Sequence, residues 1–205
     1  MRSYLCLGKA FFGNGMKGAE SNQEELIVDI LAESFDSNKS VNYVVKQDLK
    51  RDRRIRGLMQ YSYNVCNAFG EVWMSDDNQA CALVLFPDKK RTTLSAIFWD
   101  ISLAFSVIGV GRVRQVLSRE AQIKSHHPKK PFAYLWFIGV KPSAQNRHIG
   151  SSLLKELIDR YSSQGRPIYL ETSVDRNTPW YKKHGFEIFE TLQLTYPLYL
   201  LRRLG

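Results

Sequence analysis

One short segment, in which an apolar strand runs into the start of a helix, constrains the fold more than any other part of the chain. Residues 134–140 are almost continuously apolar and end just before Pro142, which is typical of a buried strand. After a polar loop, apolar residues recur at helical spacing, at Ile149, Leu153, Leu154, Leu157, Ile158 and Tyr161. The first turn of a helix offers free N–H groups at the positive end of its dipole. This junction is therefore predicted to hold a phosphate group.

The remaining pattern predicts helices, a hairpin and further helices, followed by strands that alternate with helices and by two final strands. Further helices are expected over residues 24–35, 46–69, 93–108, 112–125 and 179–183. Further strands are expected over residues 71–75, 81–86, 167–170, 186–194 and 196–202. The strand–helix–strand unit that begins at residue 134 requires a right-handed crossover. The prediction is therefore an α/β (α+β) fold, with one parallel strand pair in an otherwise antiparallel sheet.

Length and composition favour one domain. The chain has 205 residues, 44% of them hydrophobic, and neither an internal repeat nor a low-complexity linker divides it. We expect an irregular leader over residues 1–20 and a single domain over residues 21–205. The first residues lack the sustained apolar core of a secretory signal, and Met16 competes with Met1 as the native start.

The three cysteines are odd in number, and none lies in a metal-type CxxC pair. A reducing compartment is the simplest interpretation, so a cytoplasmic location is expected. Three of the histidines, His126, His127 and His184, show no metal-ligand spacing. They are predicted to face solvent, and no metal site is predicted.

The formal net charge is +9, and part of it is concentrated in residues 46–56. This segment suits either the solvated face of a helix or a field for a polyanion, such as nucleic acid, an acidic lipid surface or a nucleotide. We favour the solvated face, and predict neither a nucleic acid nor a membrane as a partner. Residues 92–111 contain only one charged residue, Asp100. Because Asp100 is central and Gly109 and Gly111 interrupt the run, a buried or lid helix is favoured over a membrane span.

Two motifs resemble a known family. Val140-x-Pro142-x-x-Gln145-x-x-x-x-Gly150 resembles the acetyl-CoA-binding motif of the GCN5-related N-acetyltransferases (GNAT), usually written Q/R-x-x-G-x-G/A. Residues 177–186 look like the second motif of that family, with Asn177, Tyr181 and Gly185-Phe186 at its offsets. The order of the motifs is also that of the family. Residues 170–173 and 176–177 are similar to the puromycin N-acetyltransferase branch.

The resemblance implies a single-domain, mostly antiparallel sheet flanked by helices, with a splayed central parallel strand pair and acetyl-CoA as the cofactor. Backbone amides would grip the pyrophosphate at Gln145, Asn146, Arg147, His148, Ile149, Gly150 and Ser151. Main-chain groups would receive the pantetheine and thioester at Ile138, Gly139 and Val140, and Asn177 would contact the cofactor arm. The family pattern has glycine at position 148, so His148 would crowd the loop, turn its imidazole outward or face a phosphate.

The resemblance implies a role for Tyr181, and its place on the chain suggests one for Glu171. Tyr181 would give a proton to the departing thiolate, which suits a phenol with an ordinary pKa of about 10. Glu171, at the end of a strand, would either take the proton of the acceptor amine or hold a cationic substrate, and both roles remain open. The aromatic residues Tyr61, Phe98, Trp99 and Phe105 are candidates to line the acceptor pocket.

The predicted function is acetyl-CoA-dependent N-acetylation of a small-molecule amine by direct attack in a ternary complex. A covalent acyl-enzyme is disfavoured because the sequence has no G-x-S-x-G nucleophile elbow and no cysteine with a basic neighbour. Two alternatives are a catalytically silent acyl-CoA sensor and a protein that binds anions or nucleic acid through residues 46–56. Whether the chain is a monomer or a homodimer stays open.

Overall fold

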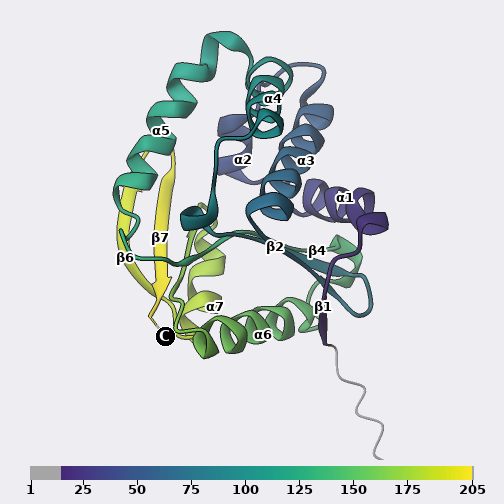
Figure 1. Ribbon diagram of the computed structural model, residues 1–205, viewed down its shortest axis with the longest axis vertical. Coiled ribbons are helices and arrows are strands. Elements are labelled where there is room, and N and C mark those ends of the chain that lie inside the picture. The colour runs from purple at the N-terminus through teal and green to yellow at the C-terminus, as the bar shows by residue number, and fades with distance from the viewer. Residues whose placement is uncertain (1–14, 205) are drawn as a thin grey trace, which may run out of the picture.

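A seven-stranded sheet organises the computed structural model, which describes residues 15–204 (Figure 1). The strands are β1 (Met16–Gly18), β2 (Gly70–Ser75), β3 (Ala80–Leu85), β4 (Ala133–Val140), β5 (Ile168–Thr172), β6 (Glu187–Gln193) and β7 (Pro197–Arg203). Their order in the sheet is β1-β2-β3-β4-β5-β7-β6, and β4–β5 is the parallel pair. The predicted α/β fold with a mixed, mostly antiparallel sheet is therefore confirmed. The predictions for residues 1–14, including the start at Met1, lie outside the described residues.

Helices cover both faces of the sheet. They are α1 (Glu24–Ser34), α2 (Lys39–Val44), α3 (Arg51–Phe69), α4 (Leu94–Ser102), α5 (Val113–Ser125), α6 (Ile149–Ser163) and α7 (Thr178–Lys183). Shorter turns are η1 (Ser21–Gln23), η2 (Pro87–Lys89), the π-helix η3 (Leu103–Ile108), η4 (Val110–Arg112), η5 (Pro142–Ala144) and η6 (Asp175–Asn177). Figure 1 shows α6 and α7 on one side of the sheet and α1 to α4 on the other.

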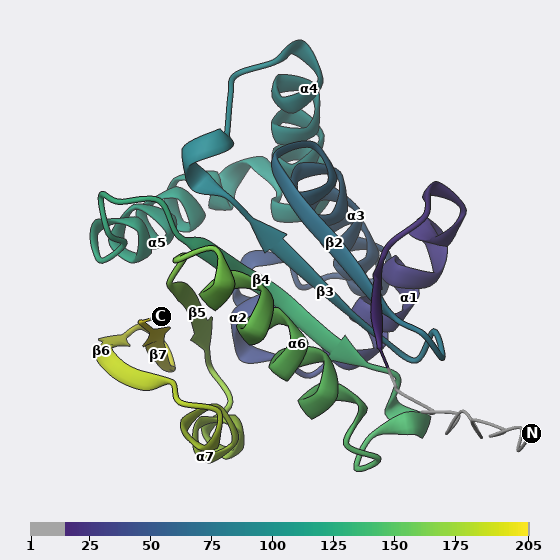
Figure 2. The same ribbon diagram turned by 60° about the horizontal axis from the view of Figure 1, so that its bottom comes forward.

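The core is divided by the sheet, because alternate residues of each strand point to opposite faces. On the face of α1 and α3, Met74, Leu83 and Phe137 pack with apolar residues of both helices. On the other face, Leu135 and Leu170 pack against the apolar side of α6. A third cluster joins α5 to β7, and Figure 2 shows α5 beside the edge of the sheet. The helical spacing of apolar residues in α6 is thus explained by burial against the sheet.

The start of one helix and the presence of another differ most from the predictions. The helix predicted over residues 46–69 begins at Arg51, because Asp48 forms a turn in which its carboxylate accepts from the N–H of Lys50 at 3.0 Å and its carbonyl from that of Arg51 at 2.9 Å. The helix α2, which has six residues, was not predicted. It is capped by Asn38, whose side chain accepts from the N–H of Val41.

The N-terminal strand β1 also departs from the predicted pattern. Residues 16–18 fall inside the predicted irregular leader, yet they pair antiparallel with β2, Met16 opposite Ser75. The hairpin turn between β2 and β3 lies where it was expected, and Asn78 takes the left-handed conformation at φ 56°. The ordered sheet therefore begins within the described part of the leader.

Candidate active site

The central feature of the site is a gap between β4 and β5. The two strands pair only at Ala133–Ile168 and Tyr134–Tyr169, although β4 continues to Val140. The register of β4 against β3 shifts between Leu83, opposite Phe137, and Val84, opposite Leu135, which leaves Trp136 as an extra residue. Such a bulge bends a strand and increases its twist. It accounts for the divergence of β4 from β5, as the splayed parallel pair requires.

Main-chain groups of β4 face this gap. Lys141 donates its N–H to the carbonyl of Gln79 at 2.8 Å, so that residue points toward β3. Because alternate residues of an antiparallel ladder point their N–H and C=O in opposite directions, Val140 and Ile138 point away from β3, toward the gap. The Val140 carbonyl accepts from Ser34 Oγ at 2.8 Å. The N–H of Val140 and the polar groups of Ile138 are therefore directed at whatever occupies the gap.

The glycine at position 139 is explained by the close packing of α1 against β4, and not by a contact with a cofactor. A Cβ at this position would lie 2.9 Å from Leu31 Cδ2 and 3.1 Å from Ser34 Oγ, both in α1. The glycine thus lets α1 approach β4 closely. Gly150 serves a similar purpose on the other face, where a Cβ would lie 3.1 Å from Val140 Cγ2. These two glycines bring both helices against the end of β4.

The N-terminus of α6 lies directly after β4 and offers unpaired backbone donors. Ser152 makes the first amide bond of the helix, to the carbonyl of His148 at 3.0 Å. The preceding N–H groups of Ile149, Gly150 and Ser151 belong to the first turn, which has no intrahelical acceptor. Together with the positive end of the helix dipole, they form a site suited to phosphate oxygens.

The loop that leads into α6 is strained at His148. This residue is the N-cap of α6 and has φ 62° and ψ 4°, a left-handed conformation that favours glycine. Asn146 has the same φ, and Gln145, Asn146, Arg147 and His148 are all exposed. The backbone at position 148 therefore takes a conformation that favours glycine, and the His148 side chain is exposed and makes no capping hydrogen bond to α6.

The helix α7 places the second motif beside the first. The indole Nε1 of Trp180 donates to Ser151 Oγ at 2.9 Å, which ties α7 to the first turn of α6. Asn177 is the N-cap of α7 and is half-buried. The Tyr181 ring is buried between Trp180 and Phe186, with ring centroids 4.7 Å and 5.6 Å away. Burial raises the pKa of Tyr181 above its ordinary value of 10.0, so its proton is retained at neutral pH.

Glu171 lies on the opposite face of the sheet from Tyr181. Its neighbour in β5, Leu170, packs on the α6 side, so Glu171 faces the side of α2 and α5. Tyr134 donates its hydroxyl to Glu171 Oε2 at 2.5 Å, and His127 Nε2 lies 3.1 Å from Oε1. Burial, followed by the charge of Glu171, raises the pKa of Tyr134, so that phenol stays a hydrogen-bond donor. Glu171 therefore stands at the foot of the gap, where β4 and β5 begin to separate.

His127 corrects the prediction that the three histidines face solvent. Its side chain is only 13% exposed, and its ring lies against those of Phe132 and Tyr134, 5.1 Å and 5.2 Å between centroids. The local sequence is a polar loop that contains prolines, and this pattern does not predict burial. The contact arises because the loop folds back over the end of β5. Within the described residues, His184 is also partly covered, with Nδ1 2.8 Å from the Trp180 carbonyl.

The aromatic residues proposed for the acceptor pocket separate into two groups. Tyr61 packs edge-on against Trp136, which in turn stacks on Tyr134, so Tyr61 joins the aromatic row next to Glu171. In contrast, Phe98 and Phe105 are 68% and 66% exposed on the outside of the molecule. For these two residues the role in an acceptor pocket stays a prediction, whereas Trp99 is partly buried against the core on the side of α1 and α3.

Sequence reasoning thus missed Tyr134 and His127 as parts of the site. The sequence held only a partial signal for Tyr134: the parallel strand pair was predicted, but the register that brings Tyr134 near Glu171 is seen only in the structure. For His127 there was none, since its contact spans 44 residues of sequence.

The profile of the Acetyltransferase (GNAT) family matches residues 62–186, which is more than half of the chain. The chain belongs to the GNAT family. Members of this family use acetyl-CoA, and membership implies acyl-CoA-dependent acetyl transfer.

Solved structures share the fold. A Corynebacterium glutamicum protein described as histone acetyltransferase HPA2 and related acetyltransferase has a TM-score of 0.70 and 22% identity, over 93% of this chain and 96% of that one. Arylalkylamine N-acetyltransferase 2 from Aedes aegypti has a TM-score of 0.62 and 11% identity, over 93% and 98%. Arabidopsis thaliana Naa50, in complex with the bisubstrate analogue CoA-Ac-MVNAL, has a TM-score of 0.50 and 16% identity, over 93% and 98%. At these identities, the similarity establishes the fold alone.

Proposed function

We propose that this GNAT protein transfers the acetyl group of acetyl-CoA to the amine of a small molecule, by direct attack in a ternary complex. One observation carries the proposal: the gap between β4 and β5 has the α6 N-terminus and Tyr181 on one face and Glu171 on the other. A donor and an acceptor can thus approach each other from opposite faces of the sheet. Proximity of this kind lowers the barrier to a reaction between two molecules.

The residues of this site fit acetyl-CoA. The unpaired N–H groups of the first turn of α6 would hold the pyrophosphate, with the loop from Gln145 to His148 wrapped beside them. Main-chain groups of Ile138 and Val140 would bind the pantetheine and the thioester carbonyl, and Asn177 would contact the cofactor arm. When bound, acetyl-CoA supplies an acetyl group activated as a thioester.

Two side chains would each carry one of the two proton transfers. The acceptor amine must be neutral to act as the nucleophile and loses one N–H proton when the amide forms, and Glu171 would accept that proton directly or through a water molecule. The N–H of Val140 stabilises the negative charge that develops on the carbonyl oxygen. Tyr181 donates its proton to the leaving thiolate sulfur. The Tyr134 hydroxyl and His127 fix the orientation of the Glu171 carboxylate, which retains lone pairs for the amine proton.

Release of the free thiol from acetyl-CoA, measured across a panel of small amines, tests the proposal. Wild-type protein should release thiol with at least one amine, and Tyr181→Phe should lower kcat by about 10²-fold, the range for loss of a general acid. Binding of acetyl-CoA without turnover of any amine would instead favour the silent acyl-CoA sensor.

A second comparison separates the two roles of Glu171. Glu171→Gln keeps the shape of the side chain and removes its charge and basicity. If Glu171 is the base, this variant lowers kcat and leaves the KM for the amine nearly unchanged. If Glu171 anchors a cationic acceptor, the KM for the amine rises and kcat changes less. Wild-type rates in the variant would exclude both roles.

Further parts of the proposal rest on the sequence. Similarity at residues 170–173 and 176–177 supports the puromycin N-acetyltransferase branch, and hence a xenobiotic amine as the acceptor. A cytoplasmic location is supported by Cys66 and Cys81, whose thiols are buried and unpaired. We retain a single acetyltransferase domain over residues 21–205, to which β1 adds an edge strand.

A further inference from the structure

The outer side of α4 and η3 bears a row of large apolar side chains, here called the α4 stripe. It consists of Leu94, Ile97, Phe98, Ile101 and Phe105. The first four follow the i, i+3, i+4, i+7 spacing of one helical face. They are 43–87% exposed, and no other element described in residues 15–204 covers them. The opposite side of the same segment, with Ala96 and Val107, packs against α3.

The loop between α2 and α3 extends this surface. Lys46 donates its N–H to the Val107 carbonyl at 3.0 Å, and Arg54 Nη1 donates to the Ser106 carbonyl at 2.5 Å. These bonds hold the loop beside the end of the α4 stripe. Leu49, in the same loop, is a fully exposed apolar residue.

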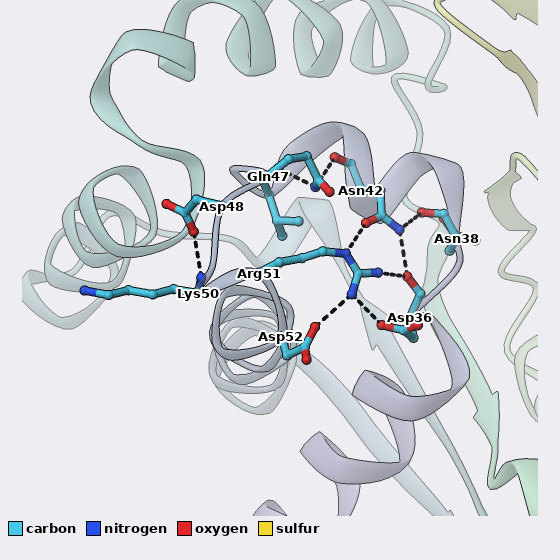
Figure 3. Close-up of polar contacts among 9 residues, drawn as sticks. Asp36, Asn38, Asn42, Gln47, Asp48, Lys50, Arg51 and Asp52 are labelled. Carbon is cyan, nitrogen blue, oxygen red and sulfur yellow. Dashed lines mark hydrogen bonds and ion pairs between the residues drawn. The ribbon is translucent and has the colours of Figure 1, made fainter.

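Polar contacts fix the shape of this loop (Figure 3). Arg51 donates from Nε to Asn42 Oδ1 at 2.9 Å and from Nη1 to Asp36 Oδ1 at 2.7 Å. Asp48 accepts from the Lys50 N–H at 3.0 Å, and Figure 3 shows the Lys50 side chain extending away from the cluster. The loop therefore presents Leu49 and Lys50 in a defined arrangement.

Cations lie at both ends of the α4 stripe. Lys89, Lys90 and Arg91 lie three to five residues before Leu94, and Lys50 and Arg53 lie at the start of α3, near the η3 end. All five are exposed, and within the described ranges none of them forms an ion pair, whereas Arg51 and Arg54 are neutralised by Asp36 and Asp48. Unpaired cations thus lie at both ends of the exposed α4 stripe.

We propose that the α4 stripe and its flanking cations dock this protein on the surface of an anionic lipid bilayer. Apolar side chains of an interfacial helix insert at the boundary between headgroups and acyl chains, and nearby lysines and arginines bind the anionic headgroups. Because the flanking cations are unpaired, their charge favours an anionic bilayer over an uncharged apolar partner. The contact lies outside the β4–β5 gap, so it does not depend on the proposed acetyl transfer.

The geometry indicates a helix that lies on the membrane. No single helix in residues 15–204 is long and apolar enough to cross a bilayer; α4–η3 and η4–α5 meet that criterion only as a pair, bent by 97°. The inner side of α4 is occupied by α3, which leaves one face for lipid. The proposal departs from the prediction of no membrane partner, because the sequence did not show that the stripe lies uncovered and beside unpaired cations.

Co-sedimentation with vesicles, in the absence of acetyl-CoA and amine, tests the proposal. Wild-type protein should bind vesicles that contain phosphatidylserine, bind pure phosphatidylcholine vesicles much more weakly, and dissociate as salt is raised. Lys50→Gln with Arg53→Gln should weaken binding by about fivefold per cation. Phe98→Ser with Phe105→Ser should weaken it by on the order of tenfold per side chain.

Matched control variants make the same kinds of substitution at exposed residues outside the α4 stripe. Lys182→Gln with Lys183→Gln removes the same charge from α7, and Leu204→Ser removes an exposed apolar side chain near the C-terminus. Both should bind like wild type. Three results would each overturn the proposal: no binding to either vesicle, equal losses in the controls, or a dimer in light scattering that the two Phe→Ser substitutions dissociate. Unchanged melting temperatures establish that the variants fold.

Discussion

His148→Gly gives the sharpest prediction about the loop that leads into α6. His148 has φ 62°, and a residue with a Cβ in the left-handed region costs about 1–2 kcal/mol. Glycine removes this strain but gives the unfolded chain more freedom, which offsets about 0.4–1 kcal/mol. We therefore expect a net stabilisation of about 0.5–1 kcal/mol. In a domain of this size, that raises Tm by roughly 1–4 °C in a calorimetric melt.

Arg147→Gly is the matched control, because Arg147 is exposed in the same loop but does not have a positive φ. It should lower stability by about 0.4–1 kcal/mol. Equal destabilisation by His148→Gly and Arg147→Gly would refute the argument from backbone strain. Calorimetric titration of His148→Gly with acetyl-CoA also tests the cofactor site: affinity should be kept or improved, since backbone N–H groups do the binding. A tenfold loss shared with His148→Ala would show instead that the imidazole contacts the ligand.

Three further predictions concern stability and the junction of the two motifs. Leu157→Ala, in the buried face of α6, should cost about 2–5 kcal/mol in urea unfolding; a cost below 1 kcal/mol would contradict the packing. Although burial acts to raise the pKa of Glu71, hydrogen bonds from Arg160 and other groups lower it below its ordinary value, so its stabilisation is present above about pH 4.5 and is lost as pH falls further. Glu71→Gln should therefore flatten the dependence of Tm on pH below that value, and a parallel dependence would count against it. Ser151→Ala and Trp180→Phe should show a coupling of about 1 kcal/mol in a double-mutant cycle, whereas additive effects would mean that their hydrogen bond is not made.

The parts of the fold that are local in sequence were predictable. The strand at residues 133–140 and the helix from Ile149 follow from apolar periodicity, and the parallel strand pair follows from the crossover between them. The hairpin turn at Asn78 follows from turn chemistry. The splay itself was expected only by resemblance, because the bulge at Trp136 that bends β4 leaves no local pattern.

Contacts distant in sequence were not predictable in the same way. Glu171 was identified as a candidate from its place at a strand end, but its partners Tyr134 and His127 come from another strand and a loop. The same limit applied to α4: its apolar residues fill nearly the whole helix, and periodicity could not separate the side that packs on α3 from the exposed stripe. The helix α3 begins at Arg51 and not at residue 46 as predicted, because the Asp48 carboxylate stabilises a turn that outweighs helical propensity.

Hydrogen exchange of backbone amides, with and without acetyl-CoA, tests the central claim most directly. If acetyl-CoA occupies the β4–β5 gap with its pyrophosphate at the α6 N-terminus, exchange should slow at residues 138–140 and 145–151 and stay unchanged over 46–56. Slowing confined to the basic segment 46–56, or no slowing at a concentration well above that needed for turnover, would contradict the account.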